Sequence, residues 1–248
     1  MKRKVRNLAL FAIASFAAIM LRSTWDLYAI ARLPQPHPGP SSSDPVAARL
    51  EARVRRLSEK IGRRNYEHPR ELEAAAEYIR AEFHDAGFVV EDQDYSVRPL
   101  GRSQEFSMRN LIVTIPADAP NAPVLVIGAH YDSAPNTPGA DDNATAVAGL
   151  IELAQRLRGI RSGIEMRFVA FSTEEPPFFG SGEMGRAHSA RLLKTEARRV
   201  LGMVSLEMLG FYSDAKGSQR YPFLYRSSIP IGGTSSPRSR TSARKNFS

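Results

Sequence analysis

Imidazole and carboxylate side chains follow three apolar runs in the second half of the sequence. Neutral histidine and carboxylate oxygens are ligands that zinc accepts, and a carboxylate can also serve as a general base. These residues could therefore hold a metal ion and activate a water molecule beside it. They are His130, Asp132 and Asp142 after the first run, Glu174 and Glu175 after the second, and Glu207 after the third.

Each of these signals has a simpler interpretation when it is taken alone. Asp132 stands two residues after His130, an offset from which a carboxylate can accept the second ring N–H of a metal-bound histidine. Asp142 or Asn143 could instead cap a helix, and the acidic pair after the second run could be an exposed turn. An isolated His-x-Asp is a weak motif. Acidic residues at three successive run ends make the metal-site interpretation the better one.

The apolar runs predict the elements that would position these side chains. The runs at 124–129, 165–172 and 200–206 are short and apolar, as buried parallel strands are. Helical patterns at 147–157 and 182–194 lie between them and would provide the crossover connections. Because the carboxyl ends of parallel strands meet at one edge of a sheet, five side chains are expected to converge there: His130, Asp142, Glu174, Glu175 and Glu207.

The residues before the first run predict two helices and two further strands. Helical patterns cover 46–61 and 69–86, and Gly87 ends the second as a C-terminal cap would. Strand-like segments follow at 89–97 and 106–115. The apolar stripe expected to face the core is Leu72, Ala75, Ala76, Ile79 and Phe83. The histidines expected at the surface or in packing, and not as ligands, are His37, His68, His84 and His188.

Composition narrows the chemistry further. The chain has 248 residues and no cysteine, which excludes disulfides, thiolate metal sites and a cysteine nucleophile. Of the formal charge of +8, residues 1–40 carry +5 and residues 220–248 carry +6, so the segment between them is mildly acidic at −3. The basic residues thus belong to the chain ends, and no nucleic-acid partner is predicted.

The N-terminal segment has the pattern of an export signal. Four basic residues precede an uncharged apolar run at 7–21, as in a signal peptide or an uncleaved anchor. Residues 1–31 are therefore interpreted as a signal peptide or membrane anchor, and the Pro/Ser-rich residues 32–45 as a linker. An exported protein is expected, either membrane-anchored through this segment or secreted or periplasmic.

The motifs AHYDS, GADDNAT, STEEP and SLEMLG, in this order, resemble those of the M28 family of zinc peptidases, the co-catalytic aminopeptidases. The resemblance runs from about residue 66 to residue 212. It implies an α/β fold, a three-layer α/β/α sandwich around a mostly parallel mixed sheet. It also implies a Zn²⁺ cofactor, with two ions in the family, and a peptide or small amide substrate.

The resemblance also implies a role for each residue. His130 and Glu207 resemble the ligands of one zinc, Asp142 the carboxylate that bridges two, and Glu175 a ligand of the second. Glu174 resembles the general base, and Asp132 the residue that orients the histidine. Many members of the family carry Asp where this chain has Glu207. The function implied is hydrolysis of N-terminal peptide bonds through a metal-bound water.

The end of the chain departs from the family pattern. The family's second zinc takes a histidine well after the third strand, whereas no histidine follows His188 here. Residues 226–248 hold seven Ser and four Arg and are expected to form a basic, disordered tail. The peptidase domain at 46–225 is thus expected to be incomplete. The alternative to a fully active peptidase is a chain that holds one zinc and has impaired activity. Acyl transfer, as in the related one-zinc glutaminyl cyclases, is a further alternative.

Overall fold

The computed structural model describes residues 44–211. The predicted export segment, most of the linker and the predicted basic tail lie outside the described residues. The chain divides into two compact units between Ala48 and Arg49, so only residues 44–48 of the first unit are described. Across the described range, no helix combines the length and the apolar character needed to cross a bilayer.

A five-stranded mixed sheet forms the middle of the second unit, in the order β1-β2-β4-β3-β5. The two pairings that β2 makes, with β1 and β4, are antiparallel, and the two that β3 makes, with β4 and β5, are parallel. The predicted α/β fold with a mixed sheet is confirmed, but the sheet is not mostly parallel as expected, because two of its four pairings are antiparallel. The strands are β1 (Glu91–Val97), β2 (Phe106–Ile115), β3 (Val124–His130), β4 (Glu165–Phe171) and β5 (Val200–Ser205).

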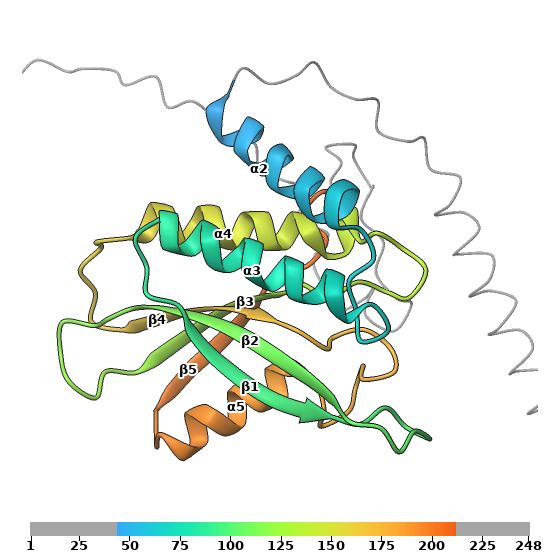
Figure 1. Ribbon diagram of the computed structural model, residues 1–248. Helices are drawn as coiled ribbons and strands as arrows, with labels where there is room; N and C mark the ends of the chain where they lie inside the picture. The colour runs from blue at the N-terminus through green and yellow to red at the C-terminus, as the bar shows by residue number, and fades with distance from the viewer. Residues whose placement is uncertain (1–43, 212–248) are drawn as a thin grey trace, which may run out of the picture. The chain divides into compact units, whose positions relative to one another are not determined.

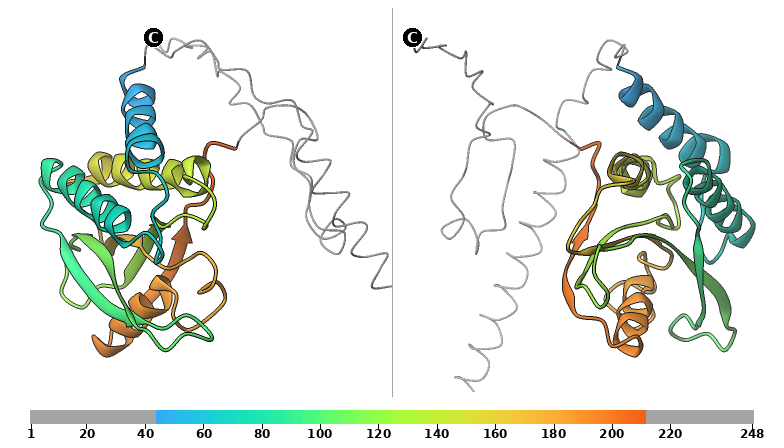
Figure 2. Two further views of the ribbon diagram at one scale, coloured as in Figure 1. Left: turned by 45° about the vertical axis from the view of Figure 1, so that its right-hand side comes forward. Right: turned by 90° about the vertical axis from the view of Figure 1, so that its left-hand side faces the viewer.

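Helices cover both faces of this sheet. Figure 1 shows α3 and α4 together on one face and α5 on the other, and the turned views of Figure 2 agree. The predicted helix at 46–61 is found as an α-helix that continues into a wider π-helical turn. The helical elements are α2 (Pro45–Arg55), η1 (Arg56–Ile61), α3 (Pro69–Asp85), η2 (Ala140–Thr145), α4 (Ala146–Leu157) and α5 (Gly185–Thr195).

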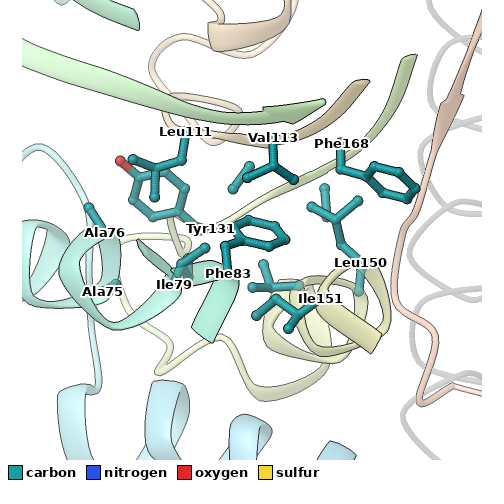
Figure 3. Close-up of a cluster of buried hydrophobic side chains, with 14 of the residues drawn as sticks. Ala75, Ala76, Ile79, Phe83, Leu111, Val113, Tyr131, Leu150, Ile151 and Phe168 are labelled. Atoms are coloured by element: carbon teal, nitrogen blue, oxygen red, sulfur yellow. The ribbon is translucent and has the colours of Figure 1, made fainter. Parts of the chain in front are cut away.

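The main core lies between the sheet and the two helices α3 and α4. All five residues of the predicted α3 stripe are buried. Figure 3 shows four residues of this stripe, from Ala75 to Phe83, and two aliphatic side chains of α4 packed against side chains of β2 and β4. The residues labelled there that join the layers are Ile79, Phe83, Leu111, Val113, Leu150, Ile151 and Phe168.

A buried ion-pair network fastens the helices to one another at a distance from the strand ends. Arg53 is 4% exposed. Its guanidinium donates to the carboxylates of Glu82 at 2.7 Å and Glu152 at 3.1 Å, and to the Gln155 side chain at 3.0 Å. Its charge is therefore paired and its donors are shared among α3 and α4, as a buried arginine requires.

The outer strand β5 differs from its neighbour β3. Every residue of β3 is buried except Leu125, which is partly buried, whereas β5 is exposed along most of its length. The register places Ile127, which is 5% exposed, beside Val204, which is 46% exposed. The strand that carries the predicted histidine is therefore packed on both faces, and the strand that leads to Glu207 is not.

Candidate metal centre

The predicted histidine ends β3 and lies at the centre of the site. His130 has a side chain that is 2% exposed. Its Nε2 atom lies 3.0 Å from Glu207 Oε1, 3.2 Å from Asp142 Oδ1 and 3.9 Å from Glu174 Oε2. The loops that follow β3, β4 and β5 thus each place at least one carboxylate near Nε2 of His130, as expected for strands whose carboxyl ends share an edge.

Two overlapping groups of side chains could each hold a cation. One group is His130, Asp142 and Glu207, and the other is His130, Glu174 and Glu175. Within each group the ligand atoms lie no more than 4.8 Å apart. The structure therefore brings together all five residues that were expected to meet, although their individual roles as ligand or base remain predictions.

Asp132 joins the histidine to the loop after β4. Its carboxylate lies 3.3 Å from His130 Nδ1 and accepts the backbone N–H of Glu174 at 3.0 Å and that of Glu175 at 3.1 Å. The predicted orienting role fits this position, because the ring nitrogen beside the carboxylate would carry the proton and leave Nε2 free to bind a metal. The two amide contacts were not predicted, and they fix both glutamates relative to the histidine.

Asn143 links the loop of Asp142 to the loop of Glu207. Its buried side-chain amide donates to Leu206 O at 3.0 Å and its oxygen accepts the N–H of Met208 at 3.0 Å. The helix-cap interpretation of Asn143 is therefore wrong, since both polar atoms bind the backbone on either side of Glu207. Asp142 itself has a non-helical backbone within η2 and makes no capping hydrogen bond there.

A second polar network, centred on the Tyr95 hydroxyl, contacts the start of the loop after β4. The Tyr95 hydroxyl lies 2.8 Å from Ser172 Oγ and 3.1 Å from Thr173 Oγ1, and it donates to Asn110 Oδ1 at 3.3 Å. Thr173 has a positive φ of 61°, which a β-branched residue rarely adopts. The hydroxyl contacts hold this unusual backbone directly before Glu174.

The acidic surroundings shift the pKa values of the site. Burial alone would lower the pKa of His130, but hydrogen bonds to Asp132, Asp142 and Glu207 raise it to about 12. Burial raises the pKa of Glu175 to about 7, and the nearby charges of Asp142 and Asp132 act in the same direction. Burial also raises the pKa of Glu174. So many carboxylates around one imidazole call for a positive charge among them.

Glu175 gives the clearest indication that a cation fits. Its residue is 8% exposed, and its Oε1 atom is buried without a hydrogen-bond partner among the described residues. An unpaired buried carboxylate oxygen is costly, and coordination to a metal would remove that cost. The donor set of one imidazole and several carboxylates is one that zinc accepts.

The remaining described histidines lie outside these ligand groups, as predicted. His188 lies in α5, and its ring stacks on the ring of Tyr95 with the two ring centroids 3.9 Å apart. His84 is 80% exposed, and His68 lies with Nδ1 3.0 Å from Asn65 Oδ1. His37 falls outside the described residues.

Comparison with known proteins agrees with the arrangement of the site. The family model described as "Peptidase family M28" matches residues 110–230, which include all six predicted site residues. The resemblance to that family is confirmed. The M28 match begins within β2, so β1 and α3 precede it.

Individual proteins resemble the chain in sequence or in fold. The chain is 40% identical over 183 residues to YfbL of Escherichia coli (strain K12), covering 70% of this chain and 53% of that protein. It thus spans about half the length of that relative. A glutaminyl cyclase from Fimbriiglobus ruber aligns with a TM-score of 0.54 and 25% identity, over 69% of this chain and 65% of that one.

A solved zinc aminopeptidase shows the same fold. BSAP from Bacillus subtilis aligns with a TM-score of 0.55 and 16% identity, over 65% of this chain and 69% of that one. At that identity the likeness speaks for the fold alone. The predicted zinc-exopeptidase type of α/β architecture is confirmed by it.

Proposed function

We propose that the chain is a zinc-dependent peptidase that hydrolyses the N-terminal peptide bond of its substrate. The family match supports a peptidase, and the donor set supports zinc. The observation that carries the proposal is the meeting of four carboxylate side chains with the imidazole of His130, with Glu174 among them. In this proposal His130, Asp142 and Glu207 hold one zinc, and Glu175 with Asp142 contributes to a second position.

Glu174 is the general base in this proposal. Its side chain is 19% exposed, so it is reachable by water, and burial raises its pKa towards the range in which a carboxylate can both accept and release a proton. When bound, zinc supplies a Lewis acid that polarises the scissile carbonyl and makes a water molecule more acidic. Glu174 would take the proton of that water and pass it to the departing amine.

The other residues of the site orient these groups. Asp132 holds the tautomer of His130 and, through the amide of Glu174, the base itself. Asn143 fixes the separation between the Asp142 loop and the Glu207 loop. A substrate amide would therefore meet a base and a metal whose relative positions are set by backbone contacts.

The direct test is hydrolysis of an aminoacyl p-nitroanilide by the full chain, with and without added zinc. Zinc-dependent release of the anilide, abolished by a chelator and restored by zinc, would support the proposal. A chain that binds zinc and folds, but releases no product from any of a panel of aminoacyl anilides and short peptides, would contradict it.

Acyl transfer is the second candidate, favoured by the structural likeness to a glutaminyl cyclase. A peptide with an N-terminal glutamine separates the two reactions. A cyclase would close that residue into a ring and release ammonia, whereas an aminopeptidase would release free glutamine. Mass spectrometry of the products distinguishes a loss of ammonia from a loss of the whole residue.

Export through residues 1–31 accompanies this proposal as a separate prediction. Fractionation of cells that express the full chain tests it, because an anchored protein would stay with the membrane and a secreted one would lose the segment. A chain recovered uncleaved in the soluble cytoplasmic fraction would contradict it.

A further inference from the structure

Arg64 is a fully buried arginine that no part of the proposed mechanism uses. Its side chain is 0% exposed, and it lies in the segment between η1 and α3. The guanidinium makes five hydrogen bonds, and all five acceptors are backbone carbonyl oxygens. A buried arginine is ordinarily paired with a carboxylate, so this arrangement needs an explanation.

Three of the five acceptors lie at the two ends of the loop that joins the predicted metal ligands His130 and Asp142. Arg64 Nε donates to Tyr131 O at 2.6 Å, directly after the histidine. Nη1 donates to Pro138 O at 2.6 Å and Nη2 to Gly139 O at 2.9 Å, shortly before the aspartate. The remaining two bonds go to Leu57 O and Gly62 O, which fix the guanidinium to its own segment.

Backbone contacts of the same segment strengthen the attachment. The Arg64 N–H donates to Ser133 Oγ at 3.2 Å, and Arg64 O accepts the N–H of Ser133 at 2.9 Å. The side-chain amide of Asn65 donates to Ser133 O at 3.1 Å. At the other end of the loop, Gly139 has a φ of +60°, and a Cβ there would lie 2.5 Å from Asp142 O and 2.7 Å from Ser133 Cβ. Glycine thus allows the two ends of the loop to lie close together beside Arg64.

The positive charge of Arg64 also acts on the carboxylates of the candidate site. Burial lowers the pKa of Arg64 to about 10, while the carboxylates of Asp132 and Asp142 act in the opposite direction. The guanidinium therefore remains a cation at neutral pH. A fixed positive charge behind a cluster of carboxylates offsets part of their mutual repulsion without occupying a ligand position.

We propose that Arg64 is a positioning residue that clamps both ends of the 131–139 loop and thereby sets the separation of His130 and Asp142 for metal binding. This inference rests on the proposed zinc centre. Only a planar fork with several donors can reach acceptors at both ends of the loop at once, which a lysine ammonium cannot do.

The test compares Arg64→Met with Arg53→Met, a matched control. Both arginines are buried and both substitutions remove several hydrogen bonds, but the partners of Arg53 are side chains of α3 and α4. Zinc affinity is measured in the full chain by competition with a chromophoric chelator. We expect Arg64→Met to weaken zinc binding about 10- to 100-fold, the usual range for residues that support ligands, and Arg53→Met to leave it within about twofold.

Hydrogen exchange of the zinc-free protein gives a readout that does not depend on the metal. Arg64→Met should speed exchange of the amides at 131–145 about tenfold or more relative to Arg53→Met. If the Met variant does not fold, Arg64→Lys takes its place, because it keeps the charge and loses the planar fork. It should show the same changes in zinc affinity and in amide exchange, each of smaller magnitude.

The outcomes separate the two proposals. Unchanged zinc affinity and unchanged loop exchange in the folded Arg64 variants would overturn the role given to Arg64 and leave the zinc centre standing. A native chain that binds no zinc would overturn the proposed function, while the exchange data would still decide whether Arg64 holds the loop.

Discussion

The candidate centre has an inner half and an outer half that differ in burial. The inner half follows β3 and β4, where the side chains of His130 and Asp132 are 2% and 4% exposed. The outer half comprises Asp142 and Glu207, whose side chains are 45% and 46% exposed. The same contrast separates β3, which is buried, from β5, which is largely exposed.

The difference in exposure indicates that the two halves have different roles in metal binding. Inner residues are held by several contacts each, so their geometry is set before a cation arrives. Outer residues have their backbone held through Asn143, but their carboxylates are reached by solvent and are therefore open to an arriving cation or substrate. We therefore expect substitutions in the inner half to have larger effects on metal binding than the same kind of substitution in the outer half.

The strongest test is removal of the inner ligand. His130→Ala should lower zinc affinity by about 1,000-fold or more, because it removes the one imidazole that both ligand groups share. Chelator competition and elemental analysis of the purified chain measure this. Zinc retained at near-native affinity would mean that His130 is not a ligand and would break the comparison.

Glu174 should affect turnover and not metal content. Glu174→Gln keeps the shape of the side chain and removes the base, so we expect kcat to fall about 100- to 10,000-fold with zinc retained. Because burial raises the pKa of Glu174, the native chain should lose activity as the pH falls through that raised value, above the ordinary 4.5 of a glutamate. Activity within a few fold of native would exclude Glu174 as the base.

The contrast between the strands can be measured on two paired residues. Ile127→Ala in β3 should lower the free energy of unfolding by about 2 to 4 kcal/mol, since it leaves a cavity in a packed interior. Val204→Ala, the partner in β5, should cost less than about 1 kcal/mol because Val204 is 46% exposed. Urea denaturation of both variants gives the two values, and equal losses would show that β5 is packed as tightly as β3.

The outer ligand should matter less than the inner one. Glu207→Gln preserves size and one oxygen, and we expect zinc affinity to fall about 10- to 100-fold, well short of the effect of His130→Ala. The same chelator competition compares the two variants directly. An effect as large as that of His130→Ala would remove the distinction between the halves.

The number of zinc ions bound per chain distinguishes the first proposed metal position from the second. One ligand group contains His130 and two carboxylates, a complete set for one ion. The proposed second position has only Glu175 and the shared Asp142, without an imidazole of its own. We expect one tightly bound zinc per chain of 248 residues by elemental analysis after dialysis. Two tightly held ions would require a further ligand from the chain, with His188 the first residue to replace.

The sequence predicted the parts of the site that depend on strand ends. Runs such as 124–129 are apolar because they are buried on both faces, so the position of His130 could be inferred from the run before it. The order of the sheet could not, because the antiparallel insertion of β2 between β1 and β4 depends on pairings between distant segments. Sequence patterns report burial along a strand and carry little information on which strand is its neighbour.

The supporting residues were not predicted, for a different reason. Arg64 stands in a polar stretch with other arginines, and nothing in its type or spacing marks it as the buried one. For Asn143 the sequence offered only a possible helix cap, because asparagine commonly has that role, but long-range contacts to the Glu207 loop determine its position instead. Residues that bind backbone far away in the sequence leave no local periodicity to detect.

The pairing of His130 with Glu207 also constrains how the protein is made. These two side chains meet although they stand 77 positions apart in the sequence, whereas β1 and β2 are joined by a short connection. Contacts between distant segments form late in folding, and β5 must align with β3 before Glu207 can reach the histidine. Zinc capture should therefore be one of the last events during biosynthesis, and a nascent chain released before residue 207 could hold no more than part of the ligand set.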